Sequence, residues 1–335
     1  MSLPEVGYAA PQSVEGVIAL LERYGTRAKV ISGGSDVLYL MKRGAMQPVP
    51  QVLVDLKGIP QLRGLEADPA TGLSIGSLVT IAELENSTAV ATTCPLLGTT
   101  ADLIASPQVR NVATVGGAIS QQVWCWFLRN AMRCWRAGGS VCFATQEGAD
   151  NRYYFSVMGG KDCFAAHPSD LAVSLEALGA SVEISGPGGS RTVTMEEFLP
   201  GEVKMGGTIQ SHILAPAELV TAVNVPPQAG RLAAFSKARV RNAVDFSIAS
   251  VAVVLTMEGS LVKDSRVVFG GVAQAPYRDA GVEGALAGRD LSGVSVEQVA
   301  STALTAATPL QNNGYVVDVA RGVLMDALTQ LSGSV

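Results

Sequence analysis

The sequence predicts an α+β protein with more than one domain, and three observations support this prediction. A chain of 335 residues, 48% hydrophobic and only 16% charged, can fill two or three cores and is not expected to be disordered. Segments with helical and with strand periodicity alternate through the first two thirds of the chain. After Pro226-Pro227, the best candidate for a domain boundary, apolar strands are followed by helices, which is the order expected of an α+β domain.

The elements before this boundary are predicted from capping residues and breakers. Ser13 is the expected N-cap of the first helix, and Gly25 can end that helix in a left-handed conformation. Thr80 and Glu83 form a capping box for the second helix. Such signals predict helices over residues 11–25, 80–84, 101–104 and 171–178. Apolar runs bounded by turn residues predict strands over residues 29–31, 51–56, 73–78, 180–184, 191–195 and 218–225.

The last third of the chain is expected to form an antiparallel sheet with helices on one face. Two apolar strands, SIASVAVVLTM and RVVFGGV, come first. A helix over residues 296–307 follows, with Ser295 as its N-cap, and a final helix is expected over about residues 315–331.

Two double-glycine loops lie before the boundary. Gly33-Gly34 follows a strand in the sequence KVISGGSDV, and Gly116-Gly117 follows the apolar run VATV. Glycine lets backbone N–H groups approach oxygen anions closely, so the pair of loops suggests one diphosphate held from two sides. The first loop matches neither the G-x-G-x-x-G fingerprint nor a P-loop, and either loop alone is more often an ordinary turn.

The segment from Trp124 to Asp170 differs in composition from the rest of the chain. It contains all three tryptophans and four of the five cysteines, namely Cys125, Cys134, Cys142 and Cys163. No secretory signal precedes it, so disulfides are disfavoured, while four thiolates can bind an iron–sulfur cluster or zinc. The spacing C-x8-C-x7-C-x20-C lacks the close pair usual in zinc sites. From the residues alone, both a metal site and four buried thiols remain open; the fifth thiol, Cys94, is expected to be ordinarily buried.

Charge and hydropathy exclude several classes of function. The net charge is -5 without a basic patch, which argues against nucleic-acid binding. The longest apolar run, residues 248–257, is too short to span a membrane, and a cytoplasmic location is expected unless a partner subunit carries the chain to the periplasm. His167 and His212 are far apart in sequence, and His212 is expected in a surface loop, so no catalytic residue is predicted.

Five segments, in this order, resemble the FAD-binding subunit of the molybdenum hydroxylases, the xanthine dehydrogenase family: KVISGGSDVLYLMK, RNVATVGGAIS, HPSDLAVSLEALGA, ELVTAVNVP and FSKARVRNAVDFSIASVAVVL. The resemblance covers nearly the whole chain. It implies a fold like that of vanillyl-alcohol oxidase, with two α/β FAD-binding subdomains at residues 1–56 and 57–226. It also implies an α+β domain at 227–335 like the C-terminal domain of the CO dehydrogenase flavoprotein.

The resemblance also implies how the two glycine loops contact FAD. The first loop, Lys29 to Val37, would wrap the diphosphate with backbone N–H groups. Thr114 and Gly117 would meet the diphosphate and the ribityl chain from the second loop. Ala118 stands where many relatives have Asn, so a side-chain hydrogen bond at this position would be lost.

Three further contacts with FAD are implied by the same resemblance. Asp170 would bind the ribityl hydroxyls or the isoalloxazine edge, and Val220 would lie near the ring system. Lys237 would place a positive charge near the flavin, favouring its anionic reduced form. The implied FAD-contacting residues are Lys29, Val30, Ile31, Ser32, Gly33, Gly34, Ser35, Asp36, Val37, Thr114, Gly117, Ala118, Asp170, Val220 and Lys237.

The cysteine-rich insertion, at about residues 122–168, resembles two branches of the family. These are the flavin subunits of bacterial aldehyde oxidoreductases and of 4-hydroxybenzoyl-CoA reductase, in which four cysteines ligate an extra [4Fe-4S] cluster. The cysteine spacing followed by HPSD looks closer to the aldehyde oxidoreductase type. The ligands implied are Cys125, Cys134, Cys142 and Cys163.

The function implied is electron transfer within a multi-subunit enzyme. Electrons would pass from a molybdenum-cofactor large subunit through the [2Fe-2S] centres of a small subunit to FAD and the cluster here, and on to an acceptor such as ferredoxin. In a 4-hydroxybenzoyl-CoA reductase-like alternative they would flow inward to the molybdenum site. A second alternative is a non-catalytic assembly subunit with structural zinc.

Overall fold

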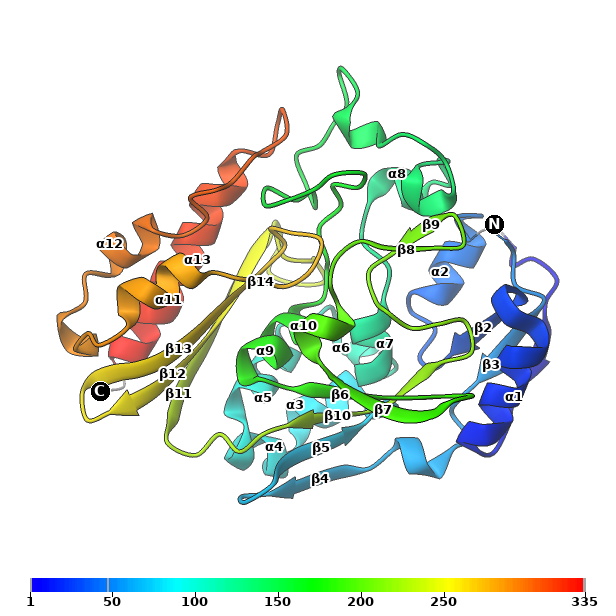
Figure 1. Ribbon diagram of the computed structural model, residues 1–335, viewed down its shortest axis with the longest axis horizontal. Coiled ribbons are helices and arrows are strands. Elements are labelled where there is room, and N and C mark those ends of the chain that lie inside the picture. Colours follow the sequence, from blue (N-terminus) through cyan, green and yellow to red (C-terminus); the bar gives the residue numbers. More distant parts are fainter. Residues whose placement is uncertain (1, 47, 334–335) are drawn as a thin grey trace.

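The computed structural model describes residues 2–46 and 48–333 and contains three layered regions (Figure 1). The first is a small parallel sheet, whose hydrophobic core also includes Leu78 and Leu219 of the central region. Helix α1 (Val14–Tyr24) packs on it, with Ser13 Oγ accepting from Gly16 N as expected of the cap. Gly25 has φ 54° and ψ -134°, so it has the positive φ of a glycine without the left-handed helical ψ that was predicted. In spatial order the strands are β1 (Gly7–Ala9), β3 (Val52–Asp55) and β2 (Ala28–Ile31).

The central region is a five-stranded antiparallel sheet covered by helices. Strand β10 returns from late in the sequence to lie in its middle, so the insertion leaves from and re-enters one folded unit. The strands in spatial order are β4 (Leu65–Asp68), β5 (Gly72–Gly76), β10 (Leu219–Val225), β6 (Ser181–Gly186) and β7 (Gly189–Thr194). The helices are α3 (Ile81–Asn86), α4 (Thr88–Thr93), α5 (Pro95–Asp102), α6 (Pro107–Arg110), α7 (Val115–Ser120), α9 (Asp170–Leu178) and α10 (Met195–Phe198).

Most predicted elements in this region are present, with one shifted. The capping box of Thr80 and Glu83 begins α3 as predicted. The helix expected over residues 101–104 is instead α5, which begins at Pro95 and ends at Asp102. Proline is favoured in the first turn of a helix, a start signal that the sequence prediction did not use.

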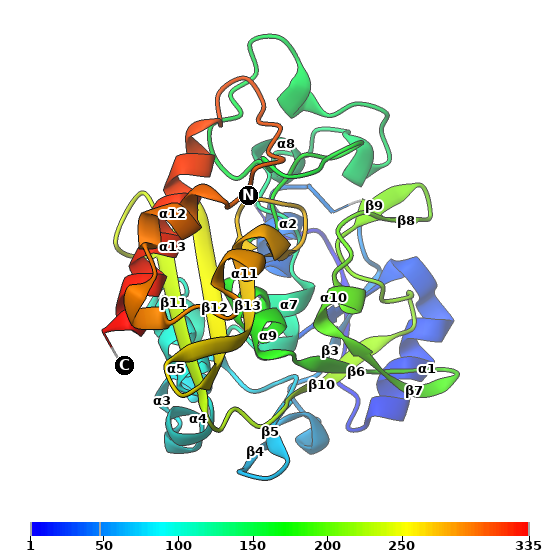
Figure 2. The same ribbon diagram turned by 60° about the vertical axis from the view of Figure 1, so that its left-hand side comes forward.

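The C-terminal region is a four-stranded antiparallel sheet that contributes to hydrophobic cores on both of its faces, with the C-terminal helices lying on one of them (Figure 2). Alternate residues of its second strand belong to different cores: Val251 and Val253 pack towards the C-terminal helices, Ala252 and Val254 towards the central region. The strands are β11 (Arg231–Ala238), β12 (Ala249–Glu258), β13 (Leu261–Gly270) and β14 (Tyr277–Arg278). The helices are α11 (Ala280–Leu286), α12 (Val296–Ser301) and α13 (Tyr315–Ser332).

The helix predicted over residues 296–307 was too long. Helix α12 ends at Ser301, because the Asp279 carboxylate accepts from Leu304 N at 2.8 Å. Leu304 itself has φ 56°, which leaves the right-handed helical region.

The insertion forms an irregular lobe at one end of the molecule, beside α2 (Val37–Lys42) in both views (Figures 1 and 2). It contains helix α8 (Trp126–Arg129) and two short 3-10 helices, Trp135–Ala137 and Phe143–Thr145. Its core includes Ile209 from the hairpin of β8 (Val203–Met205) and β9 (Thr208–Gln210), so the lobe is packed onto its neighbours. The remaining 3-10 helices are Gly25–Arg27, Pro60–Leu62 and Leu291–Gly293.

Within the described parts of the chain, no helix has the combination of length and apolar character that spanning a membrane requires.

Candidate cofactor sites

The two glycine loops meet in the folded chain. Ser32 Oγ and Thr114 Oγ1 lie 2.9 Å apart, so one hydroxyl donates to the other. A Cβ atom built on Gly33 would lie 1.8 Å from the Val112 carbonyl oxygen, so a glycine is needed for the two backbones to approach this closely. The fold therefore brings the two glycine loops into direct contact, which neither sequence motif indicated by itself.

The loops differ in the backbone donors that they leave free. Within the described residues, the N–H groups of Gly33, Gly34 and Ser35 donate to no protein acceptor. The N–H groups of the second loop are used: Gly116 N donates to Ser77 O at 2.9 Å and Gly117 N to Thr114 Oγ1 at 3.2 Å. The first loop therefore has the donor set that suits an anion, and the second loop supports it.

Lys29 and Asp36 lie at the two ends of the first loop. The Lys29 side chain is open to solvent, yet the protein atoms around it lower its pKa by desolvation, which the Asp36 carboxylate opposes. This combination is expected of a side chain on a concave surface. Asp36 Oδ2 accepts from Gln122 N at 3.0 Å, and Oδ1 lies 2.7 Å from Arg129 Nη2. The loop is thus bonded to the start of the insertion.

Asp170 and Lys237 form a buried ion pair of 2.6 Å. Ser247 and Ser250 donate to the second carboxylate oxygen, and Lys237 Nζ also donates to Leu103 O at 3.0 Å. The charge of Lys237 is therefore neutralised inside the protein. The pair joins the N-terminus of α9 to strand β11 and so connects the central and C-terminal regions.

Two other predicted contact residues, Val220 and Ala118, have apolar side chains and so no polar role. Val220 is buried in the central core, at a bulge in the pairing of β10 with β6. Ala118 is half-buried in α7, and its carbonyl oxygen accepts from Gln121 Nε2 at 2.9 Å.

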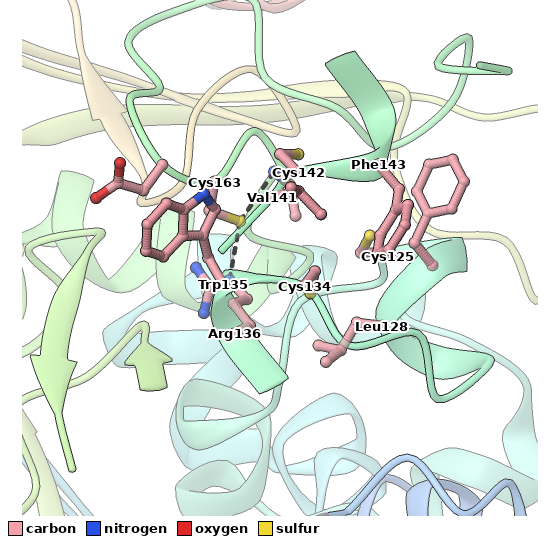
Figure 3. A pocket seen from close by; sticks show the side chains of 12 residues that line it. Cys125, Leu128, Cys134, Trp135, Arg136, Val141, Cys142, Phe143 and Cys163 are labelled. Carbon is pink, nitrogen blue, oxygen red and sulfur yellow. Dashed lines mark hydrogen bonds between the residues drawn. The ribbon is translucent and has the colours of Figure 1, made fainter. Parts of the chain in front are cut away.

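The four cysteines of the insertion line one small cavity (Figure 3). Their sulfurs stand around a common centre, although the chain reaches them from separate turns of the lobe. Burial, with smaller contributions from the neighbouring sulfurs of Cys163 and Cys134, raises the pKa of the Cys125 thiol to about 12. Burial likewise raises the pKa of Cys134 and of Cys142. Cys94 lies apart in the central core, as expected of an ordinary buried thiol.

The sulfurs are not arranged around a single ion. Among the described residues, no group of three His, Cys, Asp or Glu side chains is close enough to hold one metal ion. Four thiolates on one tetrahedral zinc, with Zn–S of about 2.3 Å, would be about 3.8 Å apart. Cys125, Cys134, Cys142 and Cys163 thus form a cysteine cage around the cavity without the spacing of a single-ion site.

The prediction that His212 lies in a surface loop was wrong. Its ring is buried and stacks on Phe198, with ring centroids 6.0 Å apart. His167 is also buried, and the two imidazoles are close enough to influence each other's charge. Burial lowers the pKa of His167 to about 3, with a further contribution from Arg136. Burial, followed by the charge of Lys29, lowers the pKa of His212 to about 4.

Two arginines of the insertion were missed by the sequence prediction. Arg129 pairs with Asp36, and its guanidinium lies over the Trp124 ring, 4.2 Å from the centroid. Arg136 donates to Cys163 Sγ. Each follows a cysteine of the cage within one helical turn, and a cation close to a thiolate is a signal that could have identified both.

Comparison with known proteins identifies the chain. Residues 4–228 match the family described as FAD binding domain in molybdopterin dehydrogenase, and residues 233–331 match the CO dehydrogenase flavoprotein C-terminal domain. The chain belongs to the FAD-binding subunits of the molybdenum hydroxylase family. The predicted family and the predicted fold are therefore confirmed, and FAD is the cofactor of this family's N-terminal region.

Several members of the family are similar along most of their length. The aldehyde oxidoreductase FAD-binding subunit PaoB of Escherichia coli K12 is 33% identical, with 90% of this chain and 91% of that protein covered. The carbon monoxide dehydrogenase medium chain of Hydrogenophaga pseudoflava is 30% identical, with 92% and 89% covered. A solved structure of the latter enzyme, which lacks the Mo-pyranopterin moiety, matches with a TM-score of 0.76 at 28% identity and covers 99% of both chains.

Proposed function

We propose that this chain carries electrons between FAD and a [4Fe-4S] cluster in a multi-subunit molybdenum enzyme of the aldehyde oxidoreductase type. The observation that carries the proposal is the meeting of Cys125, Cys134, Cys142 and Cys163 at one cavity. The lobe that holds them is bonded to the first glycine loop through Arg129 and Asp36. A cluster in the cage would thus be fixed relative to FAD by side chains of both sites.

The first glycine loop would hold the FAD diphosphate. The free N–H groups of Gly33, Gly34 and Ser35 support this role, because unpaired backbone donors in a turn bind phosphate oxygens. The remaining predicted contacts, from Lys29 to Val37 and at Thr114, Gly117, Ala118 and Val220, would surround it. Asp170 and Lys237 would act on the flavin as a neutral pair. Bound FAD supplies electron exchange in pairs or singly, and the chain supplies binding, orientation and charge.

The four thiols would ligate the cluster. The cavity between them measures about 10 Å³, the room of a single water, so cluster assembly would turn the thiol side chains outward. Burial raises the pKa of the Cys125, Cys134 and Cys142 thiols, so binding of iron as thiolates would release their protons. The structural-zinc alternative requires a tighter set of ligands than the described residues provide.

The proposed partners are a molybdenum-cofactor large subunit and a [2Fe-2S] small subunit. The names of similar proteins support this, since four of them are called medium chains or medium subunits of dehydrogenases or hydroxylases. A ferredoxin-like protein would accept the electrons. Inward flow, as in 4-hydroxybenzoyl-CoA reductase, is the alternative, and electrochemistry of the assembled enzyme would distinguish the two directions.

We also propose the domain boundaries 1–56, 57–226 and 227–335. The family matches, which end at 228 and begin at 233, support the second boundary. The core under α1, built on Val17, Leu21 and Val54, supports the first boundary, and Ile59, Leu62, Leu78 and Leu219 from beyond residue 56 pack into the same core. A cytoplasmic location stays a prediction.

The cluster proposal is tested with one substitution and a matched control. Cys134→Ser in the assembled enzyme should remove the iron beyond that of the small subunit, together with its electron paramagnetic resonance signal, and should retain FAD. Cys94→Ser, a buried thiol outside the cage, should change neither. Unchanged iron in Cys134→Ser, or zinc in place of iron in the unsubstituted enzyme, would contradict the proposal.

A further inference from the structure

Arg136 is directly bonded to one thiol of the cage. Its Nε donates to Cys163 Sγ at 3.1 Å, and both residues are buried (Figure 3). Among the described cysteines, Cys163 is the one whose sulfur accepts from a charged side chain. The environment of the cage is therefore asymmetric, with a cation on the Cys163 side.

The charge of Arg136 has no carboxylate partner among the described residues. Its other donors bond to neutral groups: Nη1 to Ser211 Oγ at 3.2 Å and to Ile209 O at 3.5 Å, and Nη2 to Gln274 Oε1 at 3.4 Å. A buried cation without a directly bonded carboxylate is unfavourable. Anionic thiolates around a cluster would supply the missing counter-charge.

A second set of hydrogen bonds fixes the Arg136 guanidinium and the Cys163 thiol relative to each other. Gln274 Nε2 donates to Cys163 O at 2.6 Å and to Glu202 Oε1 at 2.7 Å. The same Glu202 oxygen accepts from Cys163 N at 2.9 Å. Gln274 thus contacts both Arg136 and Cys163, which restricts their relative motion. The Nε–Sγ contact is a built feature of the fold and not a chance approach of a flexible side chain.

We propose that Arg136 is a positioning residue that raises the reduction potential of the cluster at Cys163. This inference rests on the proposed function. A cluster held by the four cysteines would gain one negative charge on accepting one electron from reduced FAD, and no bond at Cys163 would form or break. A hydrogen bond and a positive charge at the cysteinyl sulfur stabilise that more negative state, and both are known determinants of cluster potential. Arg136 would thereby favour electron flow from FAD to the cluster.

The test is a redox titration of the assembled enzyme, followed by the paramagnetic resonance signal of the cluster and by the flavin absorbance. Arg136→Gln should shift the cluster midpoint to a more negative potential and leave the flavin midpoint unchanged. Arg136→Lys, which keeps the charge and loses the fork-shaped donor, should shift it less. Arg133→Gln removes an exposed charge from the same lobe and should shift neither midpoint.

The outcomes separate this inference from the proposed function. An unsubstituted enzyme without a cluster signal would overturn the proposed function itself. A cluster whose midpoint is the same in the unsubstituted enzyme and in Arg136→Gln would overturn the role of Arg136 alone. If Arg136→Gln does not retain the cluster, Arg136→Lys decides: an unshifted midpoint in that variant contradicts the inference, and a negative shift supports it.

Discussion

Lys237 and Arg136 are both buried cations, but their charges are compensated differently. Lys237, beside the proposed flavin site, is paired with Asp170 at 2.6 Å. Among the described residues, Arg136, beside the cysteine cage, bonds directly to neutral groups and to a sulfur. Where the protein supplies its own counter-charge, the cation stabilises the fold in any state of the cofactors. Where the protein supplies no directly bonded counter-charge, as at Arg136, we infer that the cation interacts with an anionic ligand.

Removing the paired cation should have the largest effect. Lys237→Met leaves the Asp170 carboxylate buried without a cation and should lower the free energy of unfolding by about 3–5 kcal/mol. Adding Asp170→Asn should recover much of the loss, because the double variant buries no charge at this position. Urea unfolding measures both. Lys263→Met, at an exposed ion pair of 3.8 Å with Glu258, should change stability by less than about 1 kcal/mol. Equal losses in the single and double variants would show that the charge of Asp170 is not the cause.

Removing the iron of the proposed cluster should lower stability through its effect on Arg136. Without an anionic cluster, Arg136 is left uncompensated, so chelation should destabilise the unsubstituted enzyme more than it destabilises Arg136→Gln. The expected difference is about 1–3 kcal/mol, the usual range for two coupled groups. Thermal unfolding of the two proteins, with and without a chelator, forms the cycle that measures it. Equal destabilisation would mean that Arg136 and the metal are independent.

Lowering the pH should reduce stability by a smaller amount, through the buried imidazoles of His167 and His212 near Arg136. The pKa values of His167 and His212 are lowered from 6.5 to about 3 and about 4, so both are neutral when folded and take up a proton more readily when unfolded. Their contribution to stability is present above pH 6.5 and is lost as the pH falls towards 4 and then 3. At pH 5 the loss should be roughly 1–2 kcal/mol for each imidazole. Denaturant unfolding from pH 7 to pH 5 should show a smaller loss for His167→Gln, and an unchanged pH dependence would contradict the assignment.

Local signals in the sequence were sufficient for much of the fold. The caps at Ser13 and Thr80 and the alternation in the sheet strands depend on neighbouring residues, and the elements form where these predict. The helix at residues 101–104 was misplaced because a local start signal at Pro95 was not used, and two other predictions failed where a distant residue intervened. Asp279 accepts from Leu304 and ends α12 early, and Phe198 stacks on His212 and buries it. Both contacts join residues that are too far apart in sequence for a local pattern to predict them.

The candidate site was predictable only in part for the same reason. The cysteines were identified by composition, and the family resemblance assigned them a shared role; their common cavity supports it. The role of Arg136 depends on Gln274, which lies 138 residues further along the chain. An arginine in a mixed segment is usually solvated, so its burial against Cys163 could not be expected before the fold was known.

The bonds of the two arginines also bear on whether the lobe could be moved to another protein. Arg129 pairs with Asp36, before the insertion begins, while Arg136 depends on Ser211 and Gln274, well after it ends. Residues 122–168 are therefore not a self-contained cassette. Grafting them onto a flavoprotein that lacks a cluster would strand two cations unless the three acceptors were transplanted with them. A successful graft would therefore have to include hydrogen-bond and charge partners for both arginines.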